Sequence, residues 1–313
     1  MFVAVIFYKR SAKVRYLFGK IRIHRHWNII AGIMIVFKKA TEIRTHLLKL
    51  KKQGDTIGFV PTMGALHQGH ISLINNCKQN NTITVCSIFV NPTQFNVKKD
   101  FDNYPITIEK DIYLLENAGC DILFFPDVQE MYPDGTHTRL LYDLGYLETV
   151  LEGSYRPGHF QGVCRVVHRL LAIIPCHELY LGQKDYQQCM VIKKLVELKN
   201  IKTKIIICPT IRETDGLAMS SRNLRLSAAG RQSAIKIFET LSFLKTNIKP
   251  GNLQELKSAA VKDLTAAGFK VDYVEIANAG DLELIARWNG KAKLVALIAA
   301  FKDDVRLIDN MLL

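Results

Sequence analysis

Short apolar runs alternate with longer amphipathic segments through most of this chain, and this alternation limits its possible folds more than any other feature. Five runs are typical of strands: TIGFVPT (56–62), TITVCSIFV (82–90), CDILFFPD (120–127), ELYLG (178–182) and TKIIICPT (203–210). They are continuously apolar rather than alternating, as expected when both faces of a sheet are covered. Strands interleaved with helices favour a Rossmann-like, doubly wound parallel sheet, which is an α/β fold.

Helices are expected between these strands, and the pattern changes after residue 210. The helical pattern falls at 37–54, 70–80, 106–118, 162–174 and 186–200. Beyond residue 210 it predicts two helices, at 227–247 and 252–267, capped by Ser227 and Asn252, and then strands at 270–279 and 293–301. We therefore predict a Rossmann-like domain at 34–210 and a smaller α+β domain at 211–313.

The first 33 residues differ from the rest in charge. They hold seven Lys and Arg and no acidic residue, so the formal charge of +13 falls to +6 when they are set aside. A modest excess of this kind suits a small anionic substrate as well as a nucleic acid. The segment is either an amphipathic targeting arm or sequence that precedes a start at Met34. We favour the second interpretation, so residues 1–33 are expected to lie outside the fold.

The seven cysteines bear on the compartment. None forms a CxxC pair, and most lie inside apolar runs. This usage is typical of buried, reduced thiols, and it favours a cytoplasmic protein over a disulfide-stabilised secreted one. The apolar runs of the first 33 residues are too short to span a bilayer, so no membrane partner is expected.

Four polar segments stand where predicted strands end. They are PTMGALHQGH (61–70), FVNPTQF (89–95), GQKD (182–185) and, just past the last strand, MSSRN (219–223). Ligands of open parallel sheets bind beyond the carboxyl ends of the strands. Packing alone does not explain four such segments in these places, so they indicate a ligand site.

The first of these segments leaves a choice of functions. Gly64 and Gly69 have the spacing of a phosphate-binding Walker loop, but His70 and Ile71 stand where that loop needs Lys and Ser or Thr. A metal site is disfavoured because no third ligand clusters near the two histidines. The segment is then either a nucleotide site at a helix N-terminus, where N–H groups and the helix dipole favour phosphate, or a turn with a helix-capping histidine.

The other segments favour the nucleotide site. Ser220, Ser221 and Arg222 combine hydroxyls with a guanidinium, a set that suits a polyphosphate. Lys184 ends a predicted strand, where an ammonium can hold a phosphate as a point charge, although a single Lys is more often a solvated surface residue. Gln94 and Gln188 add amides that can orient a hydroxyl or a carboxylate.

Together these segments resemble a known family. HQGH fits the HxGH signature, and MSSRN resembles the KMSKS-type loop, of the superfamily of nucleotidylyltransferases and class I aminoacyl-tRNA synthetases. More narrowly, five segments resemble the pantoate–β-alanine ligase family over a region from Met34 to the C-terminus. In chain order these are PTMGALHQGH, SIFVNPTQF, YRPGHFQGV, GQKDYQQ and DGLAMSSRN.

The resemblance implies an activity and a set of partners. It implies ATP-dependent ligation of pantoate and β-alanine through a pantoyl adenylate, with release of pyrophosphate and AMP. ATP is then a co-substrate, and Mg²⁺ is held by the nucleotide phosphates rather than by a metal site of the protein. A homodimer in the cytoplasm, with no nucleic-acid or membrane partner, is expected on the same grounds.

The resemblance also implies roles for individual residues. The catalytic residues are His67, His70, Lys184 and Arg222. ATP is bound by Met63, His70, Gly182, Lys184, Asp185, Ile211, Met219, Ser220, Ser221 and Arg222. The substrate is bound by Pro61, Thr62, Met63, Asn91, Gln94, Arg156 and Gln188. Two positions depart from the family pattern, Thr93 where Met is usual and Ile106 where Arg is common, and neither has one of these roles.

Two other functions remain open at this point. A nucleotidylyltransferase of the same superfamily would explain the HxGH signature but not the NPTQF and GQKDYQQ segments. A non-enzymatic nucleic-acid binder built on the basic extension would bind in a salt-sensitive way. That second alternative leaves the four strand-end segments without a role.

Overall fold

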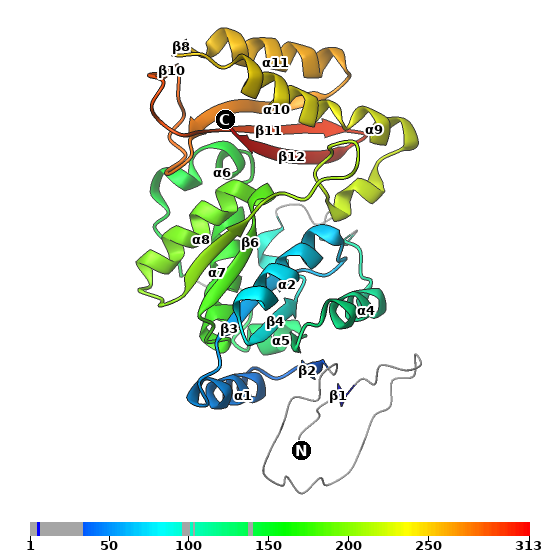
Figure 1. Cartoon of the computed structure of the whole chain (residues 1–313), viewed down its shortest axis with the longest axis vertical. Coiled ribbons are helices and arrows are strands. Elements are labelled where there is room, and N and C mark those ends of the chain that lie inside the picture. The colour runs from blue at the N-terminus through cyan, green and yellow to red at the C-terminus, as the bar shows by residue number, and fades with distance from the viewer. Residues whose placement is uncertain (1–4, 7–33, 96–100, 103, 137–139) are drawn as a thin grey trace, which may run out of the picture.

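The computed structural model of the chain describes two stacked domains (Figure 1). The described residues are 5–6, 34–95, 101–102, 104–136 and 140–313. Apart from Val5–Ile6, the basic extension lies outside the described residues, so the prediction about it stays a prediction. The domain boundary predicted at 210/211 falls in the connection between the last strand of the larger sheet and the smaller domain.

A seven-stranded sheet forms the larger domain, in the order β1-β2-β5-β4-β3-β6-β7. The strands are β1 Val5–Ile6, β2 Ile35–Phe37, β3 Ile57–Thr62, β4 Ile83–Ile88, β5 Ile122–Phe124, β6 Glu178–Gly182 and β7 Lys204–Cys208. Neighbours from β2 to β7 are parallel, and β1 is antiparallel to β2. The predicted doubly wound α/β fold is confirmed.

Helices cover both faces of this sheet. The α-helices are α1 Ala40–Lys52, α2 Gln68–Asn80, α4 Ile108–Ala118, α5 Val128–Met131, α6 Leu151–Tyr155, α7 His159–Ile173 and α8 Tyr186–Leu198. Short 3-10 helices are η1 Pro92–Gln94, η2 Gly145–Glu148 and η3 Gln183–Asp185. On β3, Phe59 packs in the core with α1, α7 and α8, and its neighbour Val60 packs in the core with α2 and α4. Burial on both faces explains why the strands are continuously apolar.

The strand order reverses direction beside β3. The chain runs from β3 through β4 to β5 on one side, and it then crosses over to place β6 and β7 on the other side. At such a reversal the connections after the two central strands diverge, which leaves a crevice outside their carboxyl ends. The residues that follow β3 and β6 therefore border this crevice.

The smaller domain has its own sheet and core. Its elements are η4 Ser221–Arg225, α9 Ala228–Ser233, α10 Lys236–Asn247, β8 Gly251–Asn252, α11 Gln254–Ala266, β9 Lys270–Asn278, β10 Arg287–Trp288, β11 Leu294–Lys302 and β12 Val305–Leu312. The antiparallel order is β12-β11-β9. Helices α10 and α11 cover the side of this sheet that faces away from the larger domain (Figure 1).

Several predicted elements need correction. The helix expected at 227–247 is divided into α9 and α10, and Ser227 caps α9 as predicted, with its hydroxyl 3.0 Å from the Gly230 nitrogen. The cap predicted at Asn252 is displaced by one residue: Leu253 is the N-cap of α11, and the Asn252 side chain, from the position before it, accepts from the Gln254 nitrogen at 2.8 Å. Strands β2 and β12 were not expected. The first has only three residues, and the second mixes charged with apolar residues because each of its faces meets a different environment.

A buried ion network joins the two domains. Arg306 of β12 donates to Glu152 of α6 and to Asp272 of β9, each at 2.7 Å. The Tyr273 hydroxyl donates to the second oxygen of Glu152 at 2.9 Å. Because the Glu152 side chain is only 9% exposed, this network holds the smaller domain in one position above the carboxyl edge of the larger sheet.

All seven cysteines are buried and free, as expected for reduced thiols. Across the residues that the structure describes, no helix is both long enough and apolar enough to cross a bilayer.

Candidate active site

A buried carboxylate shapes the loop between β3 and α2. Asp111 of α4 accepts hydrogen bonds from the backbone nitrogens of Ala65 at 2.9 Å and Leu66 at 2.8 Å, and from the Thr107 hydroxyl at 3.0 Å. Gly64 and Ala65 both have positive φ, of 84° and 50°. Two of these hydrogen bonds hold the left-handed turn, and the third, from the N-cap of α4, orients the carboxylate.

Gly64 is required by the turn for two reasons. Its φ lies in the left-handed region, where a side chain is strained. A Cβ atom there would also stand 3.1 Å from a carboxylate oxygen of Asp111 and 3.2 Å from Ile88. The glycine that resembled part of a Walker loop therefore serves the turn itself.

The two histidines of the HQGH segment form a reciprocal cap on α2. His67 is the N-cap residue, and its Nδ1 accepts from the Gly69 nitrogen at 3.2 Å, while His70 Nδ1 accepts from the His67 nitrogen at 3.3 Å. An Nδ1 atom that accepts a hydrogen bond carries no proton, so in each neutral ring we assign the proton to Nε2. The rings lie 4.1 Å apart, and together they offer two Nε2–H donors.

Both imidazoles are neutral at pH 7. Burial, and then the Lys184 ammonium, lower the pKa of His67 from 6.5 to about 4. Burial, followed by His67 and Lys184, lowers the pKa of His70 to about 3. The capping interpretation and the nucleotide interpretation of this segment are thus compatible, because capping uses Nδ1 and leaves Nε2–H for a ligand.

Cationic and hydroxyl groups line the same crevice as the histidines. Lys184 lies in η3 directly after β6, with its ammonium 3.9 Å from Asp185. The MSSR segment begins η4, where the Ser220 hydroxyl accepts from the Arg222 nitrogen at 3.2 Å. Met219 is held to the base of its loop by a backbone hydrogen bond to Ile211 of 3.0 Å.

Amides form the other end of the crevice. Gln94 Nε2 lies 2.8 Å from the Met63 sulfur, and its Oε1 accepts from Asn91 at 3.1 Å. Asn91 is only 1% exposed, and its own carbonyl accepts from the Tyr132 hydroxyl at 2.8 Å. His159 Nδ1 lies 2.8 Å from the Gln94 carbonyl. Asn91 therefore holds the Gln94 side chain in place, and His159 holds its backbone.

All residues predicted for the site line one cavity of about 250 Å³. They are Pro61, Thr62, Met63, His67, His70, Asn91, Gln94, Arg156, Gly182, Lys184, Asp185, Gln188, Ile211, Met219, Ser220, Ser221 and Arg222. A second cavity of about 470 Å³ lies between the domains and shares five of these residues, Arg156, Lys184, Asp185, Ser220 and Arg222. The structure thus brings the separate segments together, and the crevice continues under the smaller domain.

Sequence reasoning missed three residues that shape this cavity. Asp111 holds the turn after β3, and nothing in its helical context distinguished it from a surface carboxylate. Tyr104 lines the cavity and is hydrogen-bonded to Ser221, while burial raises its pKa. His159, in the YRPGHFQGV segment, was given no role in the site, and its ring contacts the backbone carbonyl of Gln94.

These features define a class of protein. A parallel α/β sheet carries an HxGH helix cap at its reversal point, and a lysine and a serine–arginine loop face it across the crevice. This is the HxGH class of nucleotide-binding α/β enzymes. The family within that class follows from comparison with known proteins.

The chain belongs to the pantoate–β-alanine ligase family, whose sequence model matches residues 35–312. It is 47% identical over 289 residues to a pantothenate synthetase of Cytophaga hutchinsonii, covering 90% of this chain and 99% of that protein. It is 42% identical to a pantothenate synthetase of Bacteroides fragilis, covering 89% and 98%. The chain is therefore an enzyme of the ligase class, as predicted.

Solved structures agree with this assignment. A pantothenate synthetase crystal structure from Thermus thermophilus matches with a TM-score of 0.80 and 37% identity, over 88% of this chain and 98% of that one. A pantoate–β-alanine ligase from Francisella tularensis matches with a TM-score of 0.74 and 41% identity, over 89% and 97%. That structure is described as a complex with β-γ ATP and β-alanine.

Proposed function

We propose that this chain joins pantoate to β-alanine at the expense of ATP, through a pantoyl adenylate, releasing pyrophosphate and AMP. One observation carries the proposal. Five segments far apart in the sequence converge on a single cavity, which has phosphate-type donors at one end and oriented amides at the other. A cavity of this kind holds a nucleotide and an acid side by side, as an acyl-adenylating enzyme requires.

In the proposed first step the pantoate carboxylate attacks the α-phosphorus of ATP, and pyrophosphate leaves. The Nε2–H groups of His67 and His70 donate to phosphate oxygens, where negative charge develops. Lys184 and Arg222 neutralise the leaving pyrophosphate, and Ser220 and Ser221 bind it. Neutral imidazoles suit this role because they donate hydrogen bonds and have no tendency to lose a proton near pH 7.

We assign the nucleoside part of ATP to residues at the end of β6 and in the loop that carries MSSR. Gly182 and Asp185 are proposed to meet the ribose, and Ile211 and Met219 to flank the adenine. Ile211 is 37% exposed, which leaves its side chain free to cover a flat base. A carboxylate can accept hydrogen bonds from both ribose hydroxyls, which would account for an acid in an otherwise cationic region.

Pantoate is proposed to bind at the amide end. Gln94 and Gln188 orient its hydroxyl groups and carboxylate, and Pro61, Thr62 and Met63 line the pocket. Arg156 borders both cavities, where it can meet a carboxylate. For Asn91 we propose an indirect role, because its amide is engaged by Gln94 and Tyr132.

In the proposed second step the β-alanine amine attacks the acyl carbon of the adenylate and displaces AMP. We assign no nucleophilic side chain, since all seven cysteines are buried, and positioning and charge stabilisation account for the reaction. Nowhere in the described residues do three His, Cys, Asp or Glu side chains gather as metal ligands. Mg²⁺ is therefore proposed to be held by the nucleotide phosphates, where it adds positive charge to the leaving pyrophosphate. Assembly as a homodimer is proposed by similarity to the family alone.

The test is exchange of labelled pyrophosphate into ATP, with Mg²⁺ and without β-alanine. We expect exchange only when pantoate is present, followed by AMP and pantothenate once β-alanine is added. A folded protein that gives no exchange with pantoate would contradict the proposal. Exchange supported instead by a phosphorylated acceptor would identify a nucleotidylyltransferase.

A further inference from the structure

Two buried polar residues near the C-terminus, Asp309 and Asn310 of β12, reach the proposed phosphate-binding segments; we call this pair the β12 clasp. Asn310 Nδ2 donates to the backbone carbonyls of Gln183 at 2.9 Å and Lys184 at 2.8 Å. Its Oδ1 accepts from the Gln183 side chain at 3.2 Å. Asn310 is 2% exposed, so these bonds are shielded from water and fix η3 against the smaller domain.

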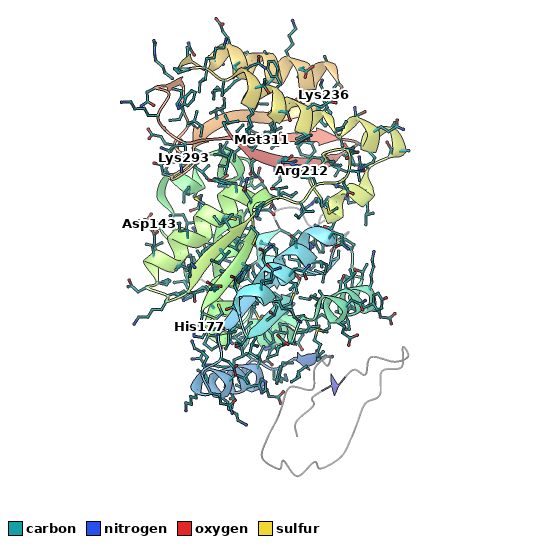
Figure 2. All side chains as sticks on the ribbon, in the orientation of Figure 1. Asp143, His177, Arg212, Lys236, Lys293 and Met311 are labelled. Atoms are coloured by element: carbon teal, nitrogen blue, oxygen red, sulfur yellow. The ribbon has the colours of Figure 1, made fainter. Side chains whose placement is uncertain are left out.

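Asp309 holds the second segment. Its two carboxylate oxygens accept from Arg212 at 2.6 and 3.2 Å. Arg212 stands at the base of the loop that carries MSSR: it pairs across that loop with Ala218 and donates to the Gly216 carbonyl at 3.0 Å. Its guanidinium also stacks 4.7 Å above the Phe238 ring. Figure 2 shows Arg212 where the two domains meet.

The clasp therefore ties together two segments that come from different domains. Asp309 and Asn310 are consecutive, and the Asn310 nitrogen donates to Asp309 Oδ1 at 2.8 Å, which makes the pair one rigid unit. Lys184 belongs to the larger domain, in η3 directly after β6. The MSSR segment belongs to the connection into the smaller domain.

We propose that the β12 clasp is a positioning device for adenylation: it sets the separation between Lys184 and the Ser220–Arg222 segment so that both reach the same triphosphate. This inference rests on the proposed function for the role of those two segments. In this proposal Asp309 and Asn310 act through the segments that they hold. Asp185 of the same η3 segment is proposed to meet the ribose, so a displaced η3 also disturbs the nucleoside. The effect should nevertheless be largest at the β- and γ-phosphates, which Lys184 and the Ser220–Arg222 segment are proposed to hold.

The chemistry of the clasp requires an amide at position 310. Two carbonyl oxygens face its Nδ2, which has two hydrogens to donate, and an amide donor faces its Oδ1. Aspartate would place a carboxylate against two carbonyls, and alanine would leave both carbonyls without this partner. Either change releases η3, and a displacement of about 1 Å at a reacting group can cost about 100-fold in rate.

The first test compares two nucleotides in the full chain. We expect Asn310→Ala to weaken ATP binding about 10-fold, to weaken AMP binding clearly less, and to slow pantoate-dependent exchange by roughly 10- to 100-fold. Isothermal titration and the exchange assay give these values. The matched control is Asn81→Ala. Asn81 is also a buried amide that donates to a backbone carbonyl, at 3.1 Å. It lies just before β4, at the amino ends of the parallel strands, whereas the proposed site lies at their carboxyl ends.

A merely structural role for Asn310 predicts a different pattern. It would lower the unfolding temperature while changing ATP and AMP affinity equally, as expected for Asn81→Ala. Equal changes for the two nucleotides, or unchanged exchange in folded Asn310→Ala, would overturn the proposal. If Asn310→Ala does not fold, Gln183→Leu removes one bond of the same contact, and it should show the same selective loss of ATP affinity on a smaller scale.

The second test is a double-mutant cycle with Lys184→Ala. If Asn310 acts by placing Lys184, the double variant should lose little more ATP affinity than Lys184→Ala alone. Fully additive losses would overturn the proposal. A wild-type protein that binds ATP but shows no pantoate-dependent exchange would end the proposed function, and the comparison of ATP with AMP would still decide the role of the clasp.

Discussion

Two neutral imidazoles face the crevice because each ring uses Nδ1 for a backbone cap and is largely removed from water. The same hydrogen bonds fix the ring orientation and the position of the proton. A single pair of residues thus ends the loop, begins α2 and presents two donors to the proposed phosphate site. At this scale the chemistry of the site depends on which nitrogen of each ring is engaged.

Removal of one charge-stabilising donor should slow adenylation selectively. We expect His67→Ala and Lys184→Ala each to lose roughly 10²–10³-fold in pantoate-dependent exchange while remaining folded, as is typical when one such donor is lost. Lys293→Ala is the control, because Lys293 is exposed on the smaller domain (Figure 2). Rates close to wild type in both site variants would remove these residues from the proposed site.

Buried neutral histidines also make stability depend on pH in a defined direction. Burial, and then Arg156, lower the pKa of His159 to about 4, whereas an unfolded histidine has a pKa near 6.5. Between these values the unfolded chain binds more protons, so the free energy of unfolding falls as the pH drops from 6.5 towards 4. Above pH 6.5 this contribution is fully present.

The test replaces the titrating ring with an amide. His159→Gln can still donate to the Gln94 carbonyl, but it does not titrate, so its free energy of unfolding should fall less steeply between pH 6.5 and 4. Urea titrations at several pH values measure this slope. Identical slopes in the variant and the wild type would contradict the assignment of a lowered pKa to His159.

Among the elements, the β3–α2 connection depends most on a partner from elsewhere in the chain. Asp111 comes from α4, yet it satisfies two backbone nitrogens of a turn in which two consecutive residues have positive φ. Left-handed residues are retained only where surrounding contacts stabilise them. The HQGH helix cap therefore relies on a carboxylate more than 40 residues away.

Loss of that carboxylate should destabilise the turn and the site together. Asp111→Asn replaces one acceptor oxygen by a donor group that faces donors, and we expect the free energy of unfolding to fall by roughly 1–3 kcal/mol. Urea denaturation gives this value, and exchange should slow in parallel. In Asp281→Asn, where an exposed carboxylate accepts a single backbone bond from Glu283, the change should be smaller. An Asp111→Asn protein as stable as wild type would show that the turn holds its shape unaided.

For the whole molecule, the relation between the domains rests on the buried network around Glu152 and on the β12 clasp. Both attach β12 to the larger domain, the first through α6 and the second through η3. The cavity of about 470 Å³ lies between these attachments. The final strand thus closes the crevice from above and determines where its two walls stand.

Breaking the buried network should cost far more than breaking a surface ion pair. Glu152→Ala leaves the Arg306 guanidinium without one of its two carboxylates and the Tyr273 hydroxyl without its acceptor. Arg306 keeps Asp272, but its guanidinium and the Tyr273 hydroxyl each lose a buried hydrogen-bond partner. We therefore expect the free energy of unfolding to fall by roughly 1–3 kcal/mol for each group left without its partner. Lys204→Ala breaks an exposed pair with Glu178 and should have little effect in the same urea titrations. Equal effects would contradict a stabilising role for the network.

Much of this protein could be predicted from its sequence, because the relevant signals are local. Continuous apolar runs identified β3 to β7, and strand-end polarity identified the segments of the site. HQGH and MSSRN indicated the superfamily, and five segments together indicated the family, because the backbone geometry of a ligand site requires particular residue types. β2 was missed because it has only three residues, and β12 because the buried polar residues Asp309 and Asn310 interrupt its apolar pattern.

The tertiary structure alone decided which strands are neighbours and which distant side chains support the site. That β3 lies beside β6, and so forms the crevice, depends on a crossover and not on any local pattern. The contact of Asn310 with Lys184 joins residues 126 positions apart. Asp111 and His159 likewise contact residues that are distant in the sequence, 46 positions away for Ala65 and 65 positions away for Gln94. Local chemistry determines which elements form and what their ends can bind. Packing between elements determines which ends meet, because burial is a property of the whole fold and not of any one segment.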